Sequence, residues 1–307
     1  MRKLLRVFCV TMTLVLMLGT LSGCGSSQTG GSTQNTEKKK IGLVVSTQDN
    51  PFFVTLKDGA QKKADELGYQ LTVADSQNDA SKERSNVEDL VQQGIAVLII
   101  NPTDSDAVAN SIKVANDKKV PVITVDRAAN GGDVVCHIAS DNVAGGKMAA
   151  EFILEQLGGK GNIVELQGIP GASATNDRGK GFHSAVDGKE GVKVVASQTA
   201  QFDRQKGLDV MQNIIQANPD FDAVFSHNDE MALGALQALK TANKKVLIVG
   251  FDGTDDAQKA IQSGEMAATV AQQPDLMGSL AVENAVKIIK GEKVEKQIPV
   301  DLKLIKK

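Results

Sequence analysis

The chain has 307 residues, about twice the ~150 residues typical of one domain, so we expect two hydrophobic cores rather than one. With 41% hydrophobic and 23% charged residues, the composition disfavours intrinsic disorder, collagen-like repeats and disulfide-dense folds. A net charge of -3 gives no electrostatic reason to expect a nucleic-acid partner. Only three His and three Cys are present, which leaves few candidates for metal binding or histidine catalysis, and we expect neither a metal nor a cofactor.

The amino-terminal segment has the pattern of an export signal. Three basic residues lie within the first six positions, an apolar run follows, and the segment ends in Leu21-Ser22-Gly23-Cys24. The apolar run is shorter than the ~20 residues that span a bilayer, which favours a signal peptide over residues 1–23 that is removed. The ending resembles a bacterial lipobox, which implies that Cys24 is lipidated and anchors the mature chain to the outer face of the cell membrane. A plain signal cut elsewhere is the alternative.

The next segment contains no apolar residue to bury. It consists mainly of Gly, Ser, Thr, Gln and Asn and ends in a short charged run, so we expect residues 24–40 to form a flexible tether with a reach of roughly 20–25 Å. Cys9 leaves with the signal and Cys24 is acylated, so the mature chain cannot form an intrachain disulfide. The remaining Cys136 lies in an apolar stretch, and we expect it to be buried.

From residue 41 onward, short β-branched runs alternate with longer segments of helical period, which predicts βαβ units. In a first series, strands are predicted at 41–46, 70–74, 97–100 and 122–125, and helices at 52–67, 81–93 and 105–116. In a second series, strands are predicted at 163–166, 192–196, 223–226 and 246–250, and helices at 142–157, 175–186, 204–216 and 229–240. The predicted fold class is α/β, with two Rossmann-like lobes whose parallel sheets are flanked by helices.

Polar side chains and phenylalanines follow the predicted strands. Open parallel α/β sheets bind ligands outside the carboxyl ends of their strands. The residues at or near those ends are Asn50, Phe52, Phe53, Asn101, Asp126, Arg127, Asn228, Phe251 and Asp252. Any one of the polar residues could be only a turn former or a helix cap, but the set as a whole favours a binding site.

The residue types in this set suit a small polyhydroxylated ligand. Amide, carboxylate and guanidinium groups together match adjacent hydroxyls that both donate and accept hydrogen bonds, and phenylalanine covers the apolar face of a sugar ring. A nucleotide is disfavoured because the chain has neither a Gly-x-x-x-x-Gly-Lys-Ser/Thr segment nor a Gly-x-Gly-x-x-Gly segment after a strand.

At these residues the chain resembles the ribose-binding proteins of bacterial ABC importers, of the type I periplasmic binding protein family, over nearly all of residues 41–307. The segments that carry the resemblance include Asn50-Pro51-Phe52-Phe53, residues 100–107, 123–127, 138–142, 177–179, 181–182, 201–204 and 228–234, Gly250-Phe251-Asp252-Gly253, and residues 271–272. Residues 174–176 depart from the family pattern, and His227 stands where Gln is more usual. We expect His227 to be a helix-start residue without a role and His183 to be a solvated helix residue.

The resemblance implies sugar contacts from both lobes. Those implied to hydrogen-bond the sugar are Asn50, Asp126, Arg127, Arg178, Asn228, Asp252 and Gln272, with Asn101 near the rim. Those implied to enclose the ring are Phe52, Phe53 and Phe202, with Phe251 beside them. Arg178, Phe202 and Gln272 come from the resemblance alone.

The resemblance further implies a high-affinity D-ribose receptor that is not an enzyme. It would be a monomer without nucleic acid, and it would close around the sugar and deliver it to an ABC permease and its ATPase subunits. The lobes would comprise residues 41–140 with 274–301 and residues 141–273 with 302–307. Three crossing segments near 140–141, 273–274 and 301–302 would join them.

Three alternatives stay open. The ligand could be another pentose, allose or a furanosyl signal molecule, held by the same groups. A sugar-responsive transcription regulator of the lactose-repressor type would need a helix-turn-helix where this chain has the signal and tether. A sugar enzyme could use Asp126 and Asp252 as paired carboxylates, but we expect Arg127 and Arg178 to keep nearby carboxylates ionised.

Overall fold

The computed structural model describes residues 39–307. The predicted signal peptide, the lipidation of Cys24 and all but the last two residues of the predicted tether lie outside the described residues. Within residues 39–307, no helix is both long and apolar enough to cross a bilayer.

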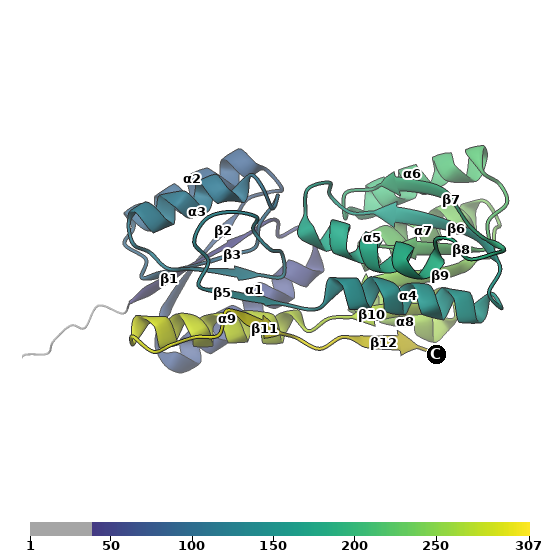
Figure 1. Ribbon diagram of the computed structural model, residues 1–307. Helices are drawn as coiled ribbons and strands as arrows, with labels where there is room; N and C mark the ends of the chain where they lie inside the picture. Colours follow the sequence, from purple (N-terminus) through teal and green to yellow (C-terminus); the bar gives the residue numbers. More distant parts are fainter. Residues whose placement is uncertain (1–38) are drawn as a thin grey trace, which may run out of the picture. The chain divides into compact units, whose positions relative to one another are not determined.

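One sheet combines strands from the first half of the described chain with one strand from its carboxyl-terminal end (Figure 1). Its six strands are all parallel, in the order β11-β5-β4-β3-β1-β2. The strands are β1 (Lys40–Val45), β2 (Gln70–Asp75), β3 (Val97–Ile100), β4 (Val122–Val125), β5 (Cys136–Ala139) and β11 (Gln297–Pro299). The helices of this lobe are α1 (Pro51–Leu67), α2 (Ala80–Gln92), α3 (Val108–Asp117) and α9 (Pro274–Ile289).

The second sheet repeats this plan, except that its last strand is antiparallel. Its order is β12-β10-β9-β8-β6-β7, and β12 runs against β10. The strands are β6 (Gly161–Gln167), β7 (Val192–Thr199), β8 (Ala223–Ser226), β9 (Leu247–Asp252), β10 (Ala268–Ala271) and β12 (Lys303–Lys306). The helices are α4 (Asn142–Gln156), α5 (Ser173–Val186), α6 (Arg204–Ala217), α7 (Asp229–Thr241) and α8 (Asp255–Ser263).

Each sheet has an apolar core on both of its faces. In the first lobe, Leu43 and Ile99 belong to one buried cluster, whereas their neighbours Val44 and Ile100 belong to another. Successive side chains of a strand point to opposite faces, so the two clusters cover the two sides of the sheet. Two further clusters do the same in the second lobe. The chain therefore has the separate cores that its length predicts.

The carboxyl-terminal part of the chain returns to the first sheet. Helix α9 packs closely along α1, because Gly278 faces the carbonyl of Leu56 and Gly59 faces the backbone of Asp275; a Cβ at either glycine would overlap those atoms. Strand β11 then pairs with β5 and β12 with β10. The chain thus passes between the two sheets three times, at 139–142, 271–274 and 299–303.

The predicted fold class is confirmed, and every predicted strand and helix is present within a few residues of its predicted ends. The helix predicted from residue 105 begins only at Val108, because Asp104 Oδ1 accepts the backbone N–H groups of Asp106 (2.9 Å) and Ala107 (2.7 Å) and holds this segment in a turn. Six elements were not predicted: β5, α8, β10, α9, β11 and β12. The four strands among them have only three or four residues, too few to show an alternating pattern.

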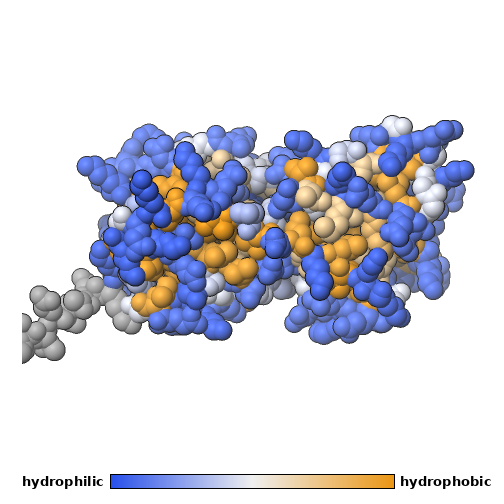
Figure 2. Space-filling view, turned by 60° about the horizontal axis from the view of Figure 1, so that its bottom comes forward, coloured by the Kyte–Doolittle hydropathy of each residue, from blue (hydrophilic) through white to orange (hydrophobic). Residues whose placement is uncertain are grey.

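Hydrophilic residues cover much of the face shown in Figure 2, with apolar residues between them. Among the described residues, the large apolar side chains that are exposed are Leu67 and Leu276, which belong to different helices. Single apolar side chains of this kind are ordinary on a protein surface and do not form an interaction patch.

Candidate functional site

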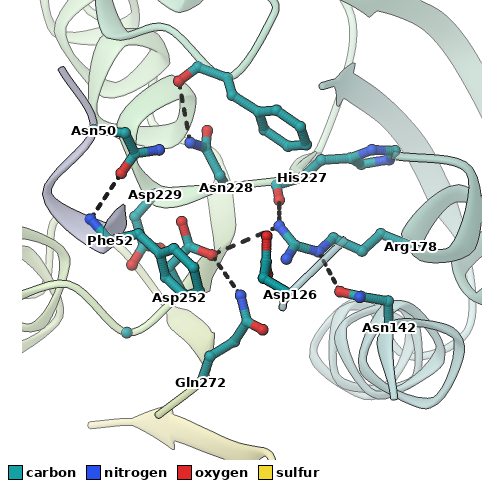
Figure 3. Close-up of polar contacts among 12 residues, drawn as sticks. Asn50, Phe52, Asp126, Asn142, Arg178, His227, Asn228, Asp229, Asp252 and Gln272 are labelled. Carbon is teal, nitrogen blue, oxygen red and sulfur yellow. Dashed lines mark hydrogen bonds and ion pairs between the residues drawn. The ribbon is translucent and has the colours of Figure 1, made fainter. Parts of the chain in front are cut away.

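The carboxyl ends of the two sheets contribute to one cavity (Figure 3). It is lined by Asn50, Phe52, Phe53, Asp126, Arg127, Ala174, Arg178, Phe202, Asn228, Asp252 and Gln272. Ten of the twelve predicted ligand-binding residues line it, and Asn101 and Phe251 do not. Ala174 was not predicted, because a small apolar residue gives no chemical signal in a sequence.

Aromatic rings from both lobes form the apolar part of the wall. Asn50 caps α1 through its Oδ1, which accepts the N–H of Phe52 at 2.9 Å and leaves the amide nitrogen for a ligand. The rings of Phe52 and Phe53 meet edge to face at 5.1 Å. Phe202 comes from the other lobe, where its ring lies over Gly168 so closely that a Cβ there would overlap it. Three of the predicted phenylalanines therefore lie around the cavity.

Asp126 and Arg127 form the polar part of the first lobe's wall. Asp126 has φ = 63°, a left-handed conformation unusual for Asp, and its N–H donates to the carbonyl of Ile138 at 2.8 Å. Arg127 Nη1 donates to the carbonyl of Pro102 at 3.2 Å. Two buried atoms, Asp126 Oδ1 and Arg127 Nε, have no hydrogen-bond partner among the described residues. Because buried polar atoms are almost always paired, these two atoms indicate where a polar ligand would bind.

Asn101 lies behind Asp126, which corrects its predicted place near the rim. It is fully buried, and its Nδ2 donates to Asp126 Oδ2 (3.0 Å) and to the carbonyl of Val125 (3.0 Å). Its Oδ1 accepts the N–H of Ser46 at 3.3 Å. Asn101 follows β3, and its bonds reach Ser46 after β1 and Val125 in β4. It can reach both because β1 and β4 are the two neighbours of β3 in the sheet. Asn101 therefore orients Asp126 and does not line the cavity.

Arg178 projects from α5 into the second lobe's wall and is 3% exposed. Its Nη1 donates to the carbonyl of His227 at 2.5 Å and its Nε to Asn142 Oδ1 at 2.8 Å (Figure 3). The guanidinium lies 3.8 Å from the ring centroid of Phe251 and 3.6 Å from Asp252 Oδ1. Phe251 thus supports Arg178 from behind and does not line the cavity, although it was predicted to lie beside the bound ring. Neighbouring residues of β9 face opposite sides of the sheet, so Phe251 and Asp252 cannot both face the cavity.

The remaining polar lining residues are held by one another. Asn228 caps α7, since its Oδ1 accepts the N–H of Met231 at 3.0 Å, and its Nδ2 donates to the carbonyl of Phe202 at 3.2 Å. Gln272 Nε2 donates to Asp252 Oδ1 at 3.0 Å. Gln272 Oε1 is buried, and the described part of the chain offers it no hydrogen-bond partner. It is a third polar atom in the cavity wall that a ligand hydroxyl could satisfy.

Burial dominates the electrostatics of the cavity. It raises the pKa of Asp126 and the pKa of Asp252 above the ordinary carboxyl value, while Arg178, and for Asp126 also Arg127, opposes the rise. Burial likewise raises the pKa of Asp229 to about 6. The two arginines therefore favour the ionised carboxyls, as expected, while burial acts against them. Within residues 39–307, no three His, Cys, Asp or Glu side chains are grouped so that they could hold a metal ion.

Two histidines differ from their predicted surroundings. His227 precedes α7 as predicted, but it is fully buried and its Nε2 lies 2.9 Å from Glu165 Oε1, a contact that was not predicted. His183 is partly exposed but contacts both Glu165 (3.3 Å) and Asp187 (3.0 Å), so it is not simply solvated. Sequence analysis missed Glu165, because a charged residue inside a strand shows nothing about its partners. Cys136 is buried as predicted, and burial raises the pKa of its thiol to about 11.

Comparison with known proteins gives a consistent result. A family model described as a periplasmic binding protein domain matches residues 41–293. The chain is 62% identical over 265 residues to the "Ribose import binding protein RbsB" of Haemophilus influenzae, which covers 86% of this chain and 90% of that protein. It is 50% identical over 297 residues to the protein of the same name from Bacillus subtilis, with coverage of 96% and 97%. The crystal structure of the Caulobacter myo-inositol binding protein bound to myo-inositol is similar at a TM-score of 0.84 and 35% identity, with coverage of 87% and 93%.

The family match agrees with the architecture. The periplasmic binding proteins are extracytoplasmic solute-binding proteins and not enzymes, and their solved members have the same two-lobed α/β fold. Since the family model spans most of the chain and close relatives cover nearly all of the described residues, this chain belongs to the periplasmic binding protein family.

Proposed function

We propose that this chain is the D-ribose-binding component of an ABC importer and delivers the sugar to the permease and its ATPase by closing its two lobes. The observation that carries the proposal is the cavity at the strand ends, in whose wall three buried polar atoms have no hydrogen-bond partner within residues 39–307: Asp126 Oδ1, Arg127 Nε and Gln272 Oε1. Asp126 Oδ1 and Gln272 Oε1 can accept hydrogen bonds and Arg127 Nε can donate one. Neighbouring sugar hydroxyls, which both donate and accept, match this combination.

The choice of ribose rests on the relatives. Two proteins that share 62% and 50% identity with this chain are named ribose import binding proteins. More distant proteins of similar structure were solved with other small polyols, including myo-inositol and D-allose. Their identities to this chain are 29%, so ribose is the better supported ligand, and another pentose, allose or a furanosyl sugar is the second candidate.

Contacts across the cleft support closure as the delivery mechanism. Ser105 in the first lobe donates its N–H to the carbonyl of Gly171 in the second (3.0 Å), and its Oγ accepts the N–H of Ser173 (3.0 Å). Ser173 Oγ in turn accepts the N–H of Ala128 at 2.8 Å. A sugar that bonds to both lobes favours the arrangement in which these contacts form, so binding shifts the population toward the closed state.

We assign the lobes to residues 41–140 with 274–301 and residues 141–273 with 302–307. The positions at which the chain passes between the sheets support this division. Short crossing segments can absorb the change in backbone angles while each sheet stays rigid. The protein acts as a monomer in this proposal, since each copy contributes both halves of its own cavity.

We also propose that residues 1–23 are removed, that Cys24 is lipidated, and that residues 24–40 tether the lobes to the outer face of the cell membrane. The support is the sequence Leu21-Ser22-Gly23-Cys24 after an apolar run. Two acyl chains on one residue would give stable anchoring where one chain is marginal. Mass spectrometry of the mature amino terminus tests this: diacylated Cys24 supports it, and an unmodified Cys24 or an intact Met1 overturns it.

Isothermal titration calorimetry tests the sugar assignment. The purified protein is titrated with D-ribose, D-allose, D-xylose, L-arabinose and myo-inositol, and we expect saturable one-to-one binding that is tightest for D-ribose. Asp126→Asn should weaken binding, whereas Asp133→Asn, a matched change at an exposed carboxyl, should not. Saturable binding of another sugar with no heat from ribose would overturn the ribose assignment and leave the binding function.

A further inference from the structure

A carboxylate and an imidazole form a buried pair in the second lobe, outside the cavity. Glu165 lies in β6 and His227 directly follows β8, and both side chains are fully buried. His227 Nε2 lies 2.9 Å from Glu165 Oε1. Neither residue lines the cavity, and the sugar contacts described above give neither of them a role.

Glu165 has a complete set of partners. Its Oε2 accepts Ser197 Oγ at 2.5 Å and Gln167 Nε2 at 3.1 Å, and His183 Nε2 lies 3.3 Å from the same oxygen. Burial alone would raise the pKa of Glu165, but the hydrogen bonds that it accepts from His227 and Ser197 lower it to about 2. Glu165 is therefore an ionised acceptor at neutral pH.

The imidazole of His227 is neutral by the same reasoning. Burial lowers the pKa of His227, and the positive charges of Arg178 and His183 lower it further, while Glu165 opposes the shift. A neutral imidazole that faces a carboxylate donates through Nε2, so Nδ1 carries no proton. Nδ1 is buried, and no described residue pairs with it, so Glu165 provides the hydrogen bond that fixes this ring.

The pair supports Arg178 from two directions. The backbone carbonyl of His227 accepts Arg178 Nη1 at 2.5 Å, so the position of residue 227 sets the position of one guanidinium nitrogen (Figure 3). The next residue of α5 is Gly179, where a Cβ would lie 3.5 Å from both Glu165 Oε1 and His227 Cε1. The pair therefore lies next to α5, within van der Waals reach of a side chain at residue 179, beside the point where Arg178 leaves the helix.

We propose that Glu165 and His227 are positioning residues for Arg178, with the imidazole joining the buried carboxylate to the carbonyl that orients the guanidinium toward the sugar. The inference rests on the proposed function, because it needs Arg178 to bind the ligand. The first lobe offers a contrast. Arg127 Nη1 also donates to a backbone carbonyl, that of Pro102, but the proline side chain cannot hydrogen-bond to a buried carboxylate as the side chain of His227 does. Sugar affinity should therefore depend on the side chain of residue 227 through Arg178.

A double-mutant cycle tests the proposal. His227→Leu should weaken D-ribose binding about tenfold, the effect of about 1.4 kcal/mol for a lost buried hydrogen bond. His227→Gln should restore most of the affinity, because its amide N–H can still donate to Glu165. If His227 acts through Arg178, the His227→Leu change should have little further effect in the Arg178→Lys background. An equal loss in both backgrounds would overturn the proposal.

A second measurement keeps the test valid where binding becomes too weak to titrate. Residues 39–307 contain four arginines, so the Nε–H NMR signal of Arg178 can be assigned by substitution. In His227→Leu this signal should shift or broaden, and in His227→Gln it should stay near its wild-type position. His137→Leu is the matched control, since His137 lies in β5 of the other lobe and contacts Thr124. An unchanged Arg178 signal in His227→Leu would overturn the proposal.

Failure of the proposed function gives a different result. If the wild-type protein binds no ribose but binds another sugar, the ribose assignment fails and the cycle is measured with that sugar. If the wild-type protein binds ribose but the two substitutions act additively, only the positioning role fails. A comparison of melting temperatures separates a loss of folding from a loss of positioning, because His227→Gln and the wild type should melt at similar temperatures.

Discussion

The two lobes each place one buried arginine at the cavity, but they hold it differently. Arg178 donates to His227 and Asn142 and lies 3.8 Å from the ring of Phe251, all within its own lobe. Arg127 donates a hydrogen bond only to the carbonyl of Pro102 at 3.2 Å, and its Nε, which has no hydrogen-bond partner among residues 39–307, lies 3.8 Å from Asp126 Oδ2.

This difference separates a fixed part of the site from an adaptable one. The guanidinium of Arg178 is oriented before the sugar arrives, which reduces the entropy lost on binding. Arg127 lies 5.3 Å from the ring centroid of Phe202, a residue of the opposite lobe, so its environment is completed by closure. The second lobe should therefore hold the preformed half of the site, and the first lobe the half that forms with the ligand.

Arg178→Ala should have the largest effect. The substitution removes a guanidinium from the cavity wall and leaves the carboxyl of Asp252 and the acceptors Asn142 and His227 buried without their partner. We expect at least about 100-fold weaker sugar binding and a loss of about 3 kcal/mol in the free energy of unfolding. Calorimetry and urea unfolding measure the two effects. Wild-type stability in this variant would contradict the idea that Arg178 is a fixed part of the second lobe.

The buried glutamates of the two lobes should respond to acid in opposite directions. Glu165 has its pKa lowered to about 2, so the stability it contributes is present above its unfolded value of 4.5 and is lost as the pH falls toward 2. The advantage of the wild type over Glu165→Gln should shrink by about 3 kcal/mol between pH 5 and pH 2.

Glu83 of the first lobe is the matched control. Burial raises the pKa of Glu83, although Thr103 N–H donates to its Oε2 at 2.7 Å. A raised pKa means that the folded state holds this proton more tightly than the unfolded state, so the advantage of the wild type over Glu83→Gln should not shrink on acidification. Urea unfolding at several pH values measures both variants. The same pH dependence in the two variants would show that the lobes do not differ in this respect.

Arg127→Ala should affect binding more than stability. One hydrogen bond and the 3.8 Å ion pair with Asp126 are lost within the first lobe, against two hydrogen bonds, an ion pair and a ring contact for Arg178, so we expect a loss of about 1–2 kcal/mol in the free energy of unfolding. Sugar binding should weaken about tenfold, because the unpaired Nε and the contact with Phe202 both serve the closed, sugar-bound state. Equal losses of stability in Arg127→Ala and Arg178→Ala would remove the proposed distinction between the arginines.

Ser173→Ala should have the smallest effect. It removes the Oγ that accepts the N–H of Ala128 across the cleft, and it changes no residue that lines the cavity. A closed state weakened by about 1 kcal/mol lowers the apparent affinity about fivefold. Ser184→Ala on the same helix is the control, because Ser184 Oγ donates within that helix to Gly181. Equal affinities of the two variants would mean that this contact does not contribute to closure.

Much of the site could be predicted because it depends on local order in the chain. Strand β4 is four buried residues followed directly by Asp126, and α7 begins directly after Asn228, so the strand ends could be located from hydrophobic runs and helix caps. Seven of the ten predicted residues that line the cavity were located in this way. Arg178, Phe202 and Gln272 needed the resemblance, since nothing in their local sequence marks them as part of a site.

The incorrect placements of Asn101 and Phe251, and the unpredicted pairing of Glu165 with His227, have a different cause. The direction in which a strand-end side chain points depends on backbone angles such as φ = 63° at Asp126 and on the neighbouring strand, so Asn101 and Phe251 turned out to support the site from behind. The pairing of Glu165 with His227 joins residues 62 positions apart, and no local pattern encodes it.

The sequence by itself determined the alternation of strands and helices, the burial of Cys136 and the identity of most lining residues, because hydrophobic period and chain order act over short distances. Only the tertiary structure decided that β11 completes the first sheet, that both lobes share one cavity, and which polar atoms in it are left without partners. Those features depend on contacts between segments far apart in the chain, and their energies are set by the packing that excludes water from them.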